Sequence, residues 1–201
     1  MRARFALQIT QTRCELREVV LKDKPQAMLD ASPKGTVPVL INIDGQVIDE
    51  SIDVMLWALQ QSDPENWLTP EHGTLTEMLS LIAEFDTNFK PNLDRYKYPN
   101  RFDNVNPAQA RGEAAKYLGE STQALANSPY LFGSSPSLAD MALIPFVRQF
   151  ANTDPAWFNA EPWPDLQRWL SSVLDSALFA AIMQKYPKWV APASGAVFPA
   201  L

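Results

Sequence analysis

The segment SPKGTVPVLINIDGQVIDES, residues 32–51, combines a turn, a strand beginning at a proline, a hairpin and a helix start. Pro38 precedes the apolar run Val39–Ile41, and proline is tolerated at the first residue of a strand because it lacks an N–H group. A cis Val37–Pro38 bond costs only about 0.5–1 kcal/mol relative to trans. Such a bond would turn the backbone of Val37 outward, so we expect its N–H and C=O groups to be offered to a ligand.

The residues after Pro38 predict a β-hairpin. Asp44-Gly45 is a strong signal for a two-residue turn between antiparallel strands. We therefore expect Leu40–Ile43 to pair with Gln46–Ile48.

A helix is predicted to begin at Asp49–Ser51, because the apolar residues that follow have helical spacing. A helix start presents free N–H groups to a carboxylate, while Glu50 can pair with an ammonium group. The pattern favours a zwitterionic amino-acid group as the ligand. In the alternative interpretation, Ser51 only caps the helix and Glu50 is a solvated surface charge, because such residues are ordinary helix starts.

Composition narrows the class of protein. The 201 residues are 46% hydrophobic and 10% aromatic, which supports a folded core. The net charge of −6 and the absence of a basic stripe argue against nucleic acid as a partner. One cysteine allows no intramolecular disulfide and fits a reducing, cytoplasmic location. The chain has neither an apolar run long enough to span a membrane nor a signal peptide, so no membrane association is expected.

The chain is predicted to contain two domains. Residues 1–61 have mixed helix and strand patterns, residues 62–73 form a polar linker with two prolines, and residues 74–201 are helical. Ser137 and Asp140 form a predicted capping box at the start of one helix. The helices are expected at 2–11, 26–29, 51–60, 75–90, 107–125, 137–150, 164–173 and 177–184, the strands at 15–21, 39–43 and 46–48, and an irregular tail from 189.

Five motifs in this order resemble the glutathione S-transferase superfamily, most closely its omega and tau types. They are LKDKP (21–25), SPKG (32–35), TVPVL (36–40), DES (49–51) and SLADMALIPF (137–146). The resemblance implies an α/β thioredoxin-like N-terminal domain followed by an all-α C-terminal domain. It also implies glutathione as co-substrate, no metal, a small electrophilic or disulfide substrate, and a homodimer.

One departure from the family pattern concerns the start of the chain. Relatives open with a first strand and a Cys-Pro, Ser or Tyr motif at the start of the first helix, whereas Met1 already lies inside that helix. We therefore assign no catalytic residue and expect it upstream of Met1, as in a longer natural chain; the alternative is a genuinely shortened paralogue. The missing strand would leave neighbouring strands with unpaired backbone groups, at about 1–3 kcal/mol for each buried group.

The resemblance implies a glutathione site with Lys24 at the glycyl carboxylate, Val37 and Pro38 along the peptide, and Glu50 with Ser51 at the γ-glutamyl end. Each role has a physical basis: a flexible ammonium for a carboxylate, an exposed strand edge for a peptide and a helix start for an α-carboxylate.

Several other residues were weighed for a role. Tyr96 and Tyr98 are candidates for the substrate cleft, with helix packing as the alternative. Lys34 is a possible further contact, but we do not assign it. Cys14 precedes a strand and is interpreted as structural, and the single histidine, His72, excludes a histidine triad or a His-rich metal site.

The leading functional hypothesis is a glutathione transferase, in which the bound thiolate attacks an electrophile or a mixed disulfide. A second is a non-catalytic protein of the same fold with a binding or regulatory role. A third, a glutaredoxin-like reductase, requires a Cys-x-x-Cys or Cys-x-x-Ser motif upstream of Met1.

Overall fold

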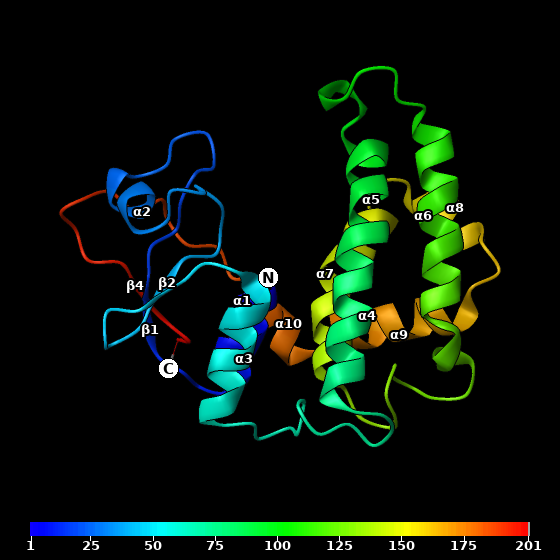
Figure 1. Ribbon diagram of the computed structural model, residues 1–201, viewed down its shortest axis with the longest axis horizontal. Coiled ribbons are helices and arrows are strands. Elements are labelled where there is room, and N and C mark those ends of the chain that lie inside the picture. Colours follow the sequence, from blue (N-terminus) through cyan, green and yellow to red (C-terminus); the bar gives the residue numbers. More distant parts are fainter. Residues whose placement is uncertain (201) are drawn as a thin grey trace. The chain divides into compact units, whose positions relative to one another are not determined.

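The computed structural model describes residues 1–200, which form two compact units (Figure 1). The first, here called the mixed unit, contains Met1–Glu65 and the described part of Ala177–Leu201. The second, here called the helical unit, contains Asn66–Ser176. This division differs from the predicted one, which placed all of residues 74–201 in one helical domain. Within residues 1–200, no helix is long and apolar enough to cross a membrane.

The mixed unit is built around the packing of α1 (Arg2–Ile9) against α3 (Ser51–Gln61). The buried side chains of α3 recur at helical spacing and so form one apolar face, as predicted for this segment; they are Val54, Met55, Ala58 and Leu59. α10 (Ala177–Ile182) also packs on α1, with the Phe179 and Phe5 ring centroids 6.4 Å apart. The short α2 (Gln26–Ala31) completes the helices of this unit.

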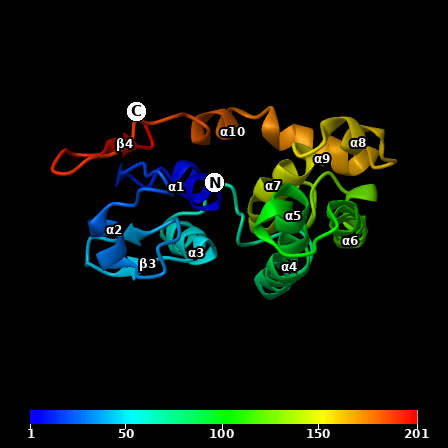
Figure 2. The same ribbon diagram turned by 90° about the horizontal axis from the view of Figure 1, so that it is seen from above.

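The strands of the mixed unit form two separate two-stranded sheets (Figures 1 and 2). β1 (Cys14–Leu16) pairs antiparallel with β4 (Ala196–Phe198), and β2 (Leu40–Ile41) pairs antiparallel with β3 (Val47–Ile48). The expectation that the C-terminal tail is irregular was therefore wrong for β4. The expectation that β1 lacks a neighbour was also wrong, because β4 bonds to its edge.

The β2–β3 hairpin was predicted correctly, but its turn differs in detail. Leu40 pairs with Ile48 and Ile41 with Val47. The N–H of Gly45 donates to the carbonyl of Asn42 at 3.0 Å, so the loop contains three residues rather than two. Gly45 adopts φ +82°, a left-handed conformation that glycine accepts without a side-chain clash.

The helical unit contains α4 (Leu75–Asn88), α5 (Lys90–Lys97), α6 (Pro107–Ser121), α7 (Leu138–Ala151), α8 (Pro155–Ala160) and α9 (Pro164–Leu174). Two short 3₁₀ helices, η1 (Pro99–Arg101) and η2 (Gln123–Ala126), join them. Sequence patterns missed α5 and α8. The predicted helix over 75–90 ends near Pro91, because proline lacks the N–H that would continue the ladder.

α7 forms the core of the helical unit, and its start confirms the predicted capping box. The carboxylate of Asp140 is fully buried and accepts hydrogen bonds from the Ser137 N–H at 2.8 Å and the Ser137 hydroxyl at 2.6 Å. It also accepts from the Leu131 N–H at 2.9 Å and the Trp169 indole at 2.8 Å. Burial raises the pKa of Asp140, and these hydrogen bonds oppose that effect.

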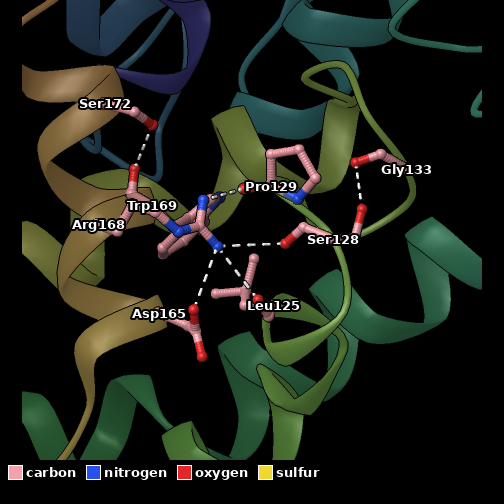
Figure 3. A network of polar contacts seen from close by, with 8 residues as sticks. All are labelled: Leu125, Ser128, Pro129, Gly133, Asp165, Arg168, Trp169 and Ser172. Carbon is pink, nitrogen blue, oxygen red and sulfur yellow. Dashed lines mark hydrogen bonds and ion pairs between the residues drawn. The ribbon is translucent and has the colours of Figure 1, made fainter.

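Arg168 on α9 fastens the loop after η2 (Figure 3). Its guanidinium donates to the carbonyl oxygens of Leu125, Ser128 and Pro129 at 3.1, 3.3 and 3.2 Å. The same side chain lies 3.7 Å from the Asp165 carboxylate. Arg168 thus attaches α9 to the segment that precedes α7, while the indole of Trp169 attaches α9 to Asp140 of α7 itself.

Candidate functional site

The turn SPKG at residues 32–35 organises the candidate site in the mixed unit. The N–H of Gly35 donates to the carbonyl of Ser32 at 3.0 Å, and Gly35 has φ +61°. The buried Ser32 hydroxyl donates to Asp49 Oδ2 at 2.6 Å. This bond attaches the turn to the residue just before Glu50, so two motifs that are distant in the sequence meet.

Lys24 lies beside this turn. A side chain placed at Gly35 would lie 3.5 Å from Lys24 Nζ and 3.3 Å from Leu29 Cδ2, so both groups pack close to the glycine. Among residues 1–200, no carboxylate forms an ion pair with Lys24, which is only partly exposed. A cation without a partner, held next to the turn, is available to an anionic ligand.

Val37 is 49% exposed and is joined to Pro38 by a cis peptide bond, as the sequence suggested. Neither the N–H nor the C=O of Val37 takes part in a backbone hydrogen bond within residues 1–200. The backbone of Val37 therefore keeps a donor and an acceptor free for an extended peptide.

The start of α3 is the third part of the candidate site. Glu50 is the N-cap residue and Ser51 the first helical residue, and the side chain of Glu50 accepts no hydrogen bond from the N–H groups of this helix end. Ser51 is therefore not the cap, whereas Glu50 is an exposed N-cap residue with 62% of its side chain accessible to solvent. The helix end keeps free N–H donors, which suit a carboxylate.

Lys34 pairs with both acidic residues at this helix start. Its Nζ lies 3.1 Å from Asp49 Oδ1 and 2.7 Å from Glu50 Oε1. Hydrogen bonds to Glu50 and then Asp49 raise the pKa of Lys34, and hydrogen bonds from Ser32 and then Lys34 lower the pKa of Asp49. The sequence alone did not assign Lys34, because its partners lie 15 and 16 positions further along the chain.

This cluster predicts a pH effect that can be measured on one carboxyl group. Because Asp49 has a lowered pKa, its contribution to stability is present above the ordinary pKa of 3.8 and is lost as the pH falls through the folded-state pKa. Ser32→Ala removes the largest cause of the shift, so the pKa of Asp49 measured by NMR titration should rise toward its ordinary value. Ser62→Ala, beyond the other end of α3, serves as the control. A wild-type pKa at or above 3.8 would contradict the hydrogen bonds described.

The two predicted substrate-side tyrosines lie in the helical unit. The ring of Tyr96 packs edge-on against Phe150 with centroids 5.6 Å apart. Tyr98 follows α5, and the guanidinium carbon of Arg101 lies 4.0 Å from its ring centroid. Both contacts are packing interactions of the helical unit, and the role of Tyr96 and Tyr98 in a substrate cleft stays a prediction.

The remaining sequence candidates have structural surroundings. Cys14 lies in β1 opposite Phe198, and burial raises the pKa of its thiol more than Arg4 lowers it, so no activated thiolate is favoured. Arg4 pairs with Glu18 inside the mixed unit. His72 is largely exposed, and residues 1–200 contain no cluster of three or more potential metal ligands.

Two surface hollows lie in the chain, one in each unit, and neither is lined by Lys24, Val37, Glu50 or Ser51. The hollow of the mixed unit, about 270 Å³, is lined by Asp23, Pro25 and Gln26 on one side and by residues 188–191 on the other. The hollow of the helical unit, about 230 Å³, lies between α4, α5 and α6. Val37 and Glu50 of the candidate site are exposed, with 49% of Val37 and 62% of the Glu50 side chain accessible, which suits an extended peptide bound along the surface.

Family models match both parts of the chain. The model "Glutathione S-transferase, N-terminal domain" matches residues 1–67, and "Glutathione S-transferase, C-terminal domain" matches residues 82–172. The chain belongs to the glutathione S-transferase superfamily. Membership confirms the fold expected from the sequence, a thioredoxin-like N-terminal unit with a helical C-terminal unit.

One curated relative and two solved structures are similar to this chain. Glutathione S-transferase omega-1 of Mus musculus is 25% identical over 187 residues, which cover 92% of this chain and 72% of the relative. The structure of a sphingomonad glutathione S-transferase complexed with glutathione is similar with a TM-score of 0.72 and 23% identity, covering 90% of this chain and 91% of the other. A family member from Pseudomonas fluorescens with two glutathione molecules bound has a TM-score of 0.75 at 15% identity, covering 90% and 86%.

Proposed function

We propose that this protein binds glutathione at the candidate site of the mixed unit and acts as a glutathione transferase. The observation that carries the proposal is the convergence around one turn of Lys24, which forms no ion pair within residues 1–200, of the Val37 backbone, which forms no backbone hydrogen bond there, and of the start of α3. These groups match the three polar parts of the tripeptide: a terminal carboxylate, a peptide backbone and an amino-acid head.

Each part of the ligand has a partner of complementary chemistry. Lys24 takes the glycyl carboxylate as a mobile ammonium group. The N–H and C=O of Val37, next to Pro38, bind the cysteinyl backbone as a strand edge does. Ser51 and the free N–H groups of α3 bind the α-carboxylate, and Glu50 binds the α-ammonium group.

The chemistry that follows binding is transfer of the glutathione thiol to a small electrophile, or its exchange with a mixed disulfide. No residue of the described chain is assigned the catalytic role, because the first turn of α1 carries no nucleophile and Cys14 has a raised pKa. A second candidate function is a non-catalytic protein that binds glutathione. Turnover with an electrophile and with a glutathionyl mixed disulfide separates the two.

Binding is tested by retention on immobilised glutathione, elution with free glutathione and calorimetric measurement of Kd. Glu50→Gln should weaken glutathione binding about tenfold, which corresponds to about 1.4 kcal/mol for a charge-assisted hydrogen bond. Asp53→Asn is the matched control, because Asp53 is an exposed acid in the first turn of the same helix. Its Kd should stay within twofold of wild type. No retention of the wild-type chain would contradict the proposal.

The homodimer that the resemblance implies and the cytoplasmic location that the single cysteine favours stay predictions of this proposal. Sedimentation equilibrium of the full chain checks the first, and fractionation of the source cells checks the second.

A further inference from the structure

The ion pairs at the start of α3 bear on which ligands the proposed site selects. Lys34 Nζ lies 2.7 Å from Glu50 Oε1, so the ammonium of the chain already occupies one oxygen of the carboxylate proposed for the ligand's α-ammonium group. The second oxygen, Oε2, has no partner within residues 1–200. One of the two carboxylate oxygens of Glu50 is therefore already occupied before a ligand binds.

Local structure holds Lys34 in this place. The turn that carries Lys34 is fixed by the Gly35 to Ser32 bond of 3.0 Å. The Ser32 hydroxyl and Lys34 Nζ together occupy both oxygens of Asp49, at 2.6 and 3.1 Å. Asp49 is the most buried carboxylate of the group, with 25% of its side chain exposed, and anchors Lys34 beside Glu50. The three charges sum to −1 rather than the −2 of two bare carboxylates.

We propose that Lys34 is a specificity-determining residue that acts through Glu50, lowering the selectivity of the site for ligands with a free α-amino group. The inference rests on the proposed binding of glutathione. A carboxylate already paired with an ammonium attracts a second ammonium less strongly. A ligand without an α-ammonium group leaves the Glu50 carboxylate paired with Lys34 rather than unpaired. The site then accepts γ-glutamyl-like peptides whose amino group is absent or blocked.

The test compares two ligands: glutathione and its glutaryl analogue, which lacks only the α-amino group. Selectivity is the Kd of the analogue divided by the Kd of glutathione, both measured by calorimetry on the full chain. Lys34→Met should raise this ratio about two- to fivefold, the size expected for exposed ion pairs. Lys34→Arg retains the charge and should keep the wild-type ratio, as should Lys185→Met, which removes an exposed lysine elsewhere in the mixed unit.

A double variant shows whether Lys34 acts through Glu50. In a Glu50→Gln background, Lys34→Met should leave the ratio unchanged, because the carboxylate through which Lys34 acts is gone. A rise of the same size in that background would come from net charge alone and would overturn the inference. An unchanged ratio in Lys34→Met would also overturn it, with glutathione binding intact. Failure of the wild-type chain to bind either ligand would instead refute the proposed function, and the inference with it.

Discussion

Replacing Asp140 with alanine is expected to lower the free energy of unfolding of the helical unit by at least about 3 kcal/mol. The substitution leaves the Leu131 N–H, the Ser137 N–H and the Trp169 indole N–H without their acceptor. Each buried donor without a partner costs about 1–3 kcal/mol. The loss is large because these bonds join the start of α7 to α9 and to the segment before α7.

Urea unfolding followed by tryptophan fluorescence measures this effect, since Trp169 belongs to the same network. Ser137→Ala removes only the hydroxyl of the capping box and should cost about 1 kcal/mol. A midpoint for Asp140→Ala equal to that of wild type would show that solvent or rearranged side chains satisfy the three donors.

Replacing Phe198 with alanine is expected to destabilise the mixed unit by about 3 kcal/mol. Phe198 is 1% exposed, packs edge-on against Tyr186 with centroids 6.3 Å apart and lies beneath the guanidinium of Arg4. Its loss leaves a cavity under β4 and weakens the pairing of β4 with β1. Cys14, which pairs with Phe198, should then react at least about tenfold faster with a thiol reagent, because about 1.4 kcal/mol of lost protection already gives that factor.

Val197 provides a control for this experiment, and Gly195 provides a second way to detach β4. Val197→Ala alters the neighbouring residue, which is 60% exposed, and should change stability by less than about 0.5 kcal/mol. Gly195→Ala should also detach β4, since a Cβ atom there would lie 2.4 Å from the carbonyl oxygen of Leu16. If Cys14 reacts equally slowly in all variants, β4 does not protect β1.

Short-range signals in the sequence were the most informative ones. The turn at Asn42–Gln46, the start of α3 and the capping box of Ser137 and Asp140 are each set by residues within a few positions of one another. Their backbone hydrogen bonds depend on local conformational preferences, so patterns of proline, glycine and acidic residues predict them well. The family resemblance that these motifs carry placed Lys24, Val37, Glu50 and Ser51 as candidates.

Patterns in the sequence did not predict the pairings between residues far apart in the chain. The β1–β4 pairing joins residues about 180 positions apart, and Ala196–Phe198 is too short for a reliable strand pattern. The partners of Lys34 depend on how the turn docks against Asp49. α8 (six residues) was also missed, whereas α2 and α10, of the same length, were predicted.

The sequence by itself determined the superfamily, most of the helices, the β2–β3 hairpin and the residue types available to a peptide ligand, because these depend on local pattern and composition. Only the tertiary structure decided that β4 covers β1, that Lys34 neutralises Glu50, and that Asp140 serves two helices at once. The physical reason is that side-chain packing and buried hydrogen bonds hold distant segments together. These contacts form only when the chain folds and brings the segments to one another.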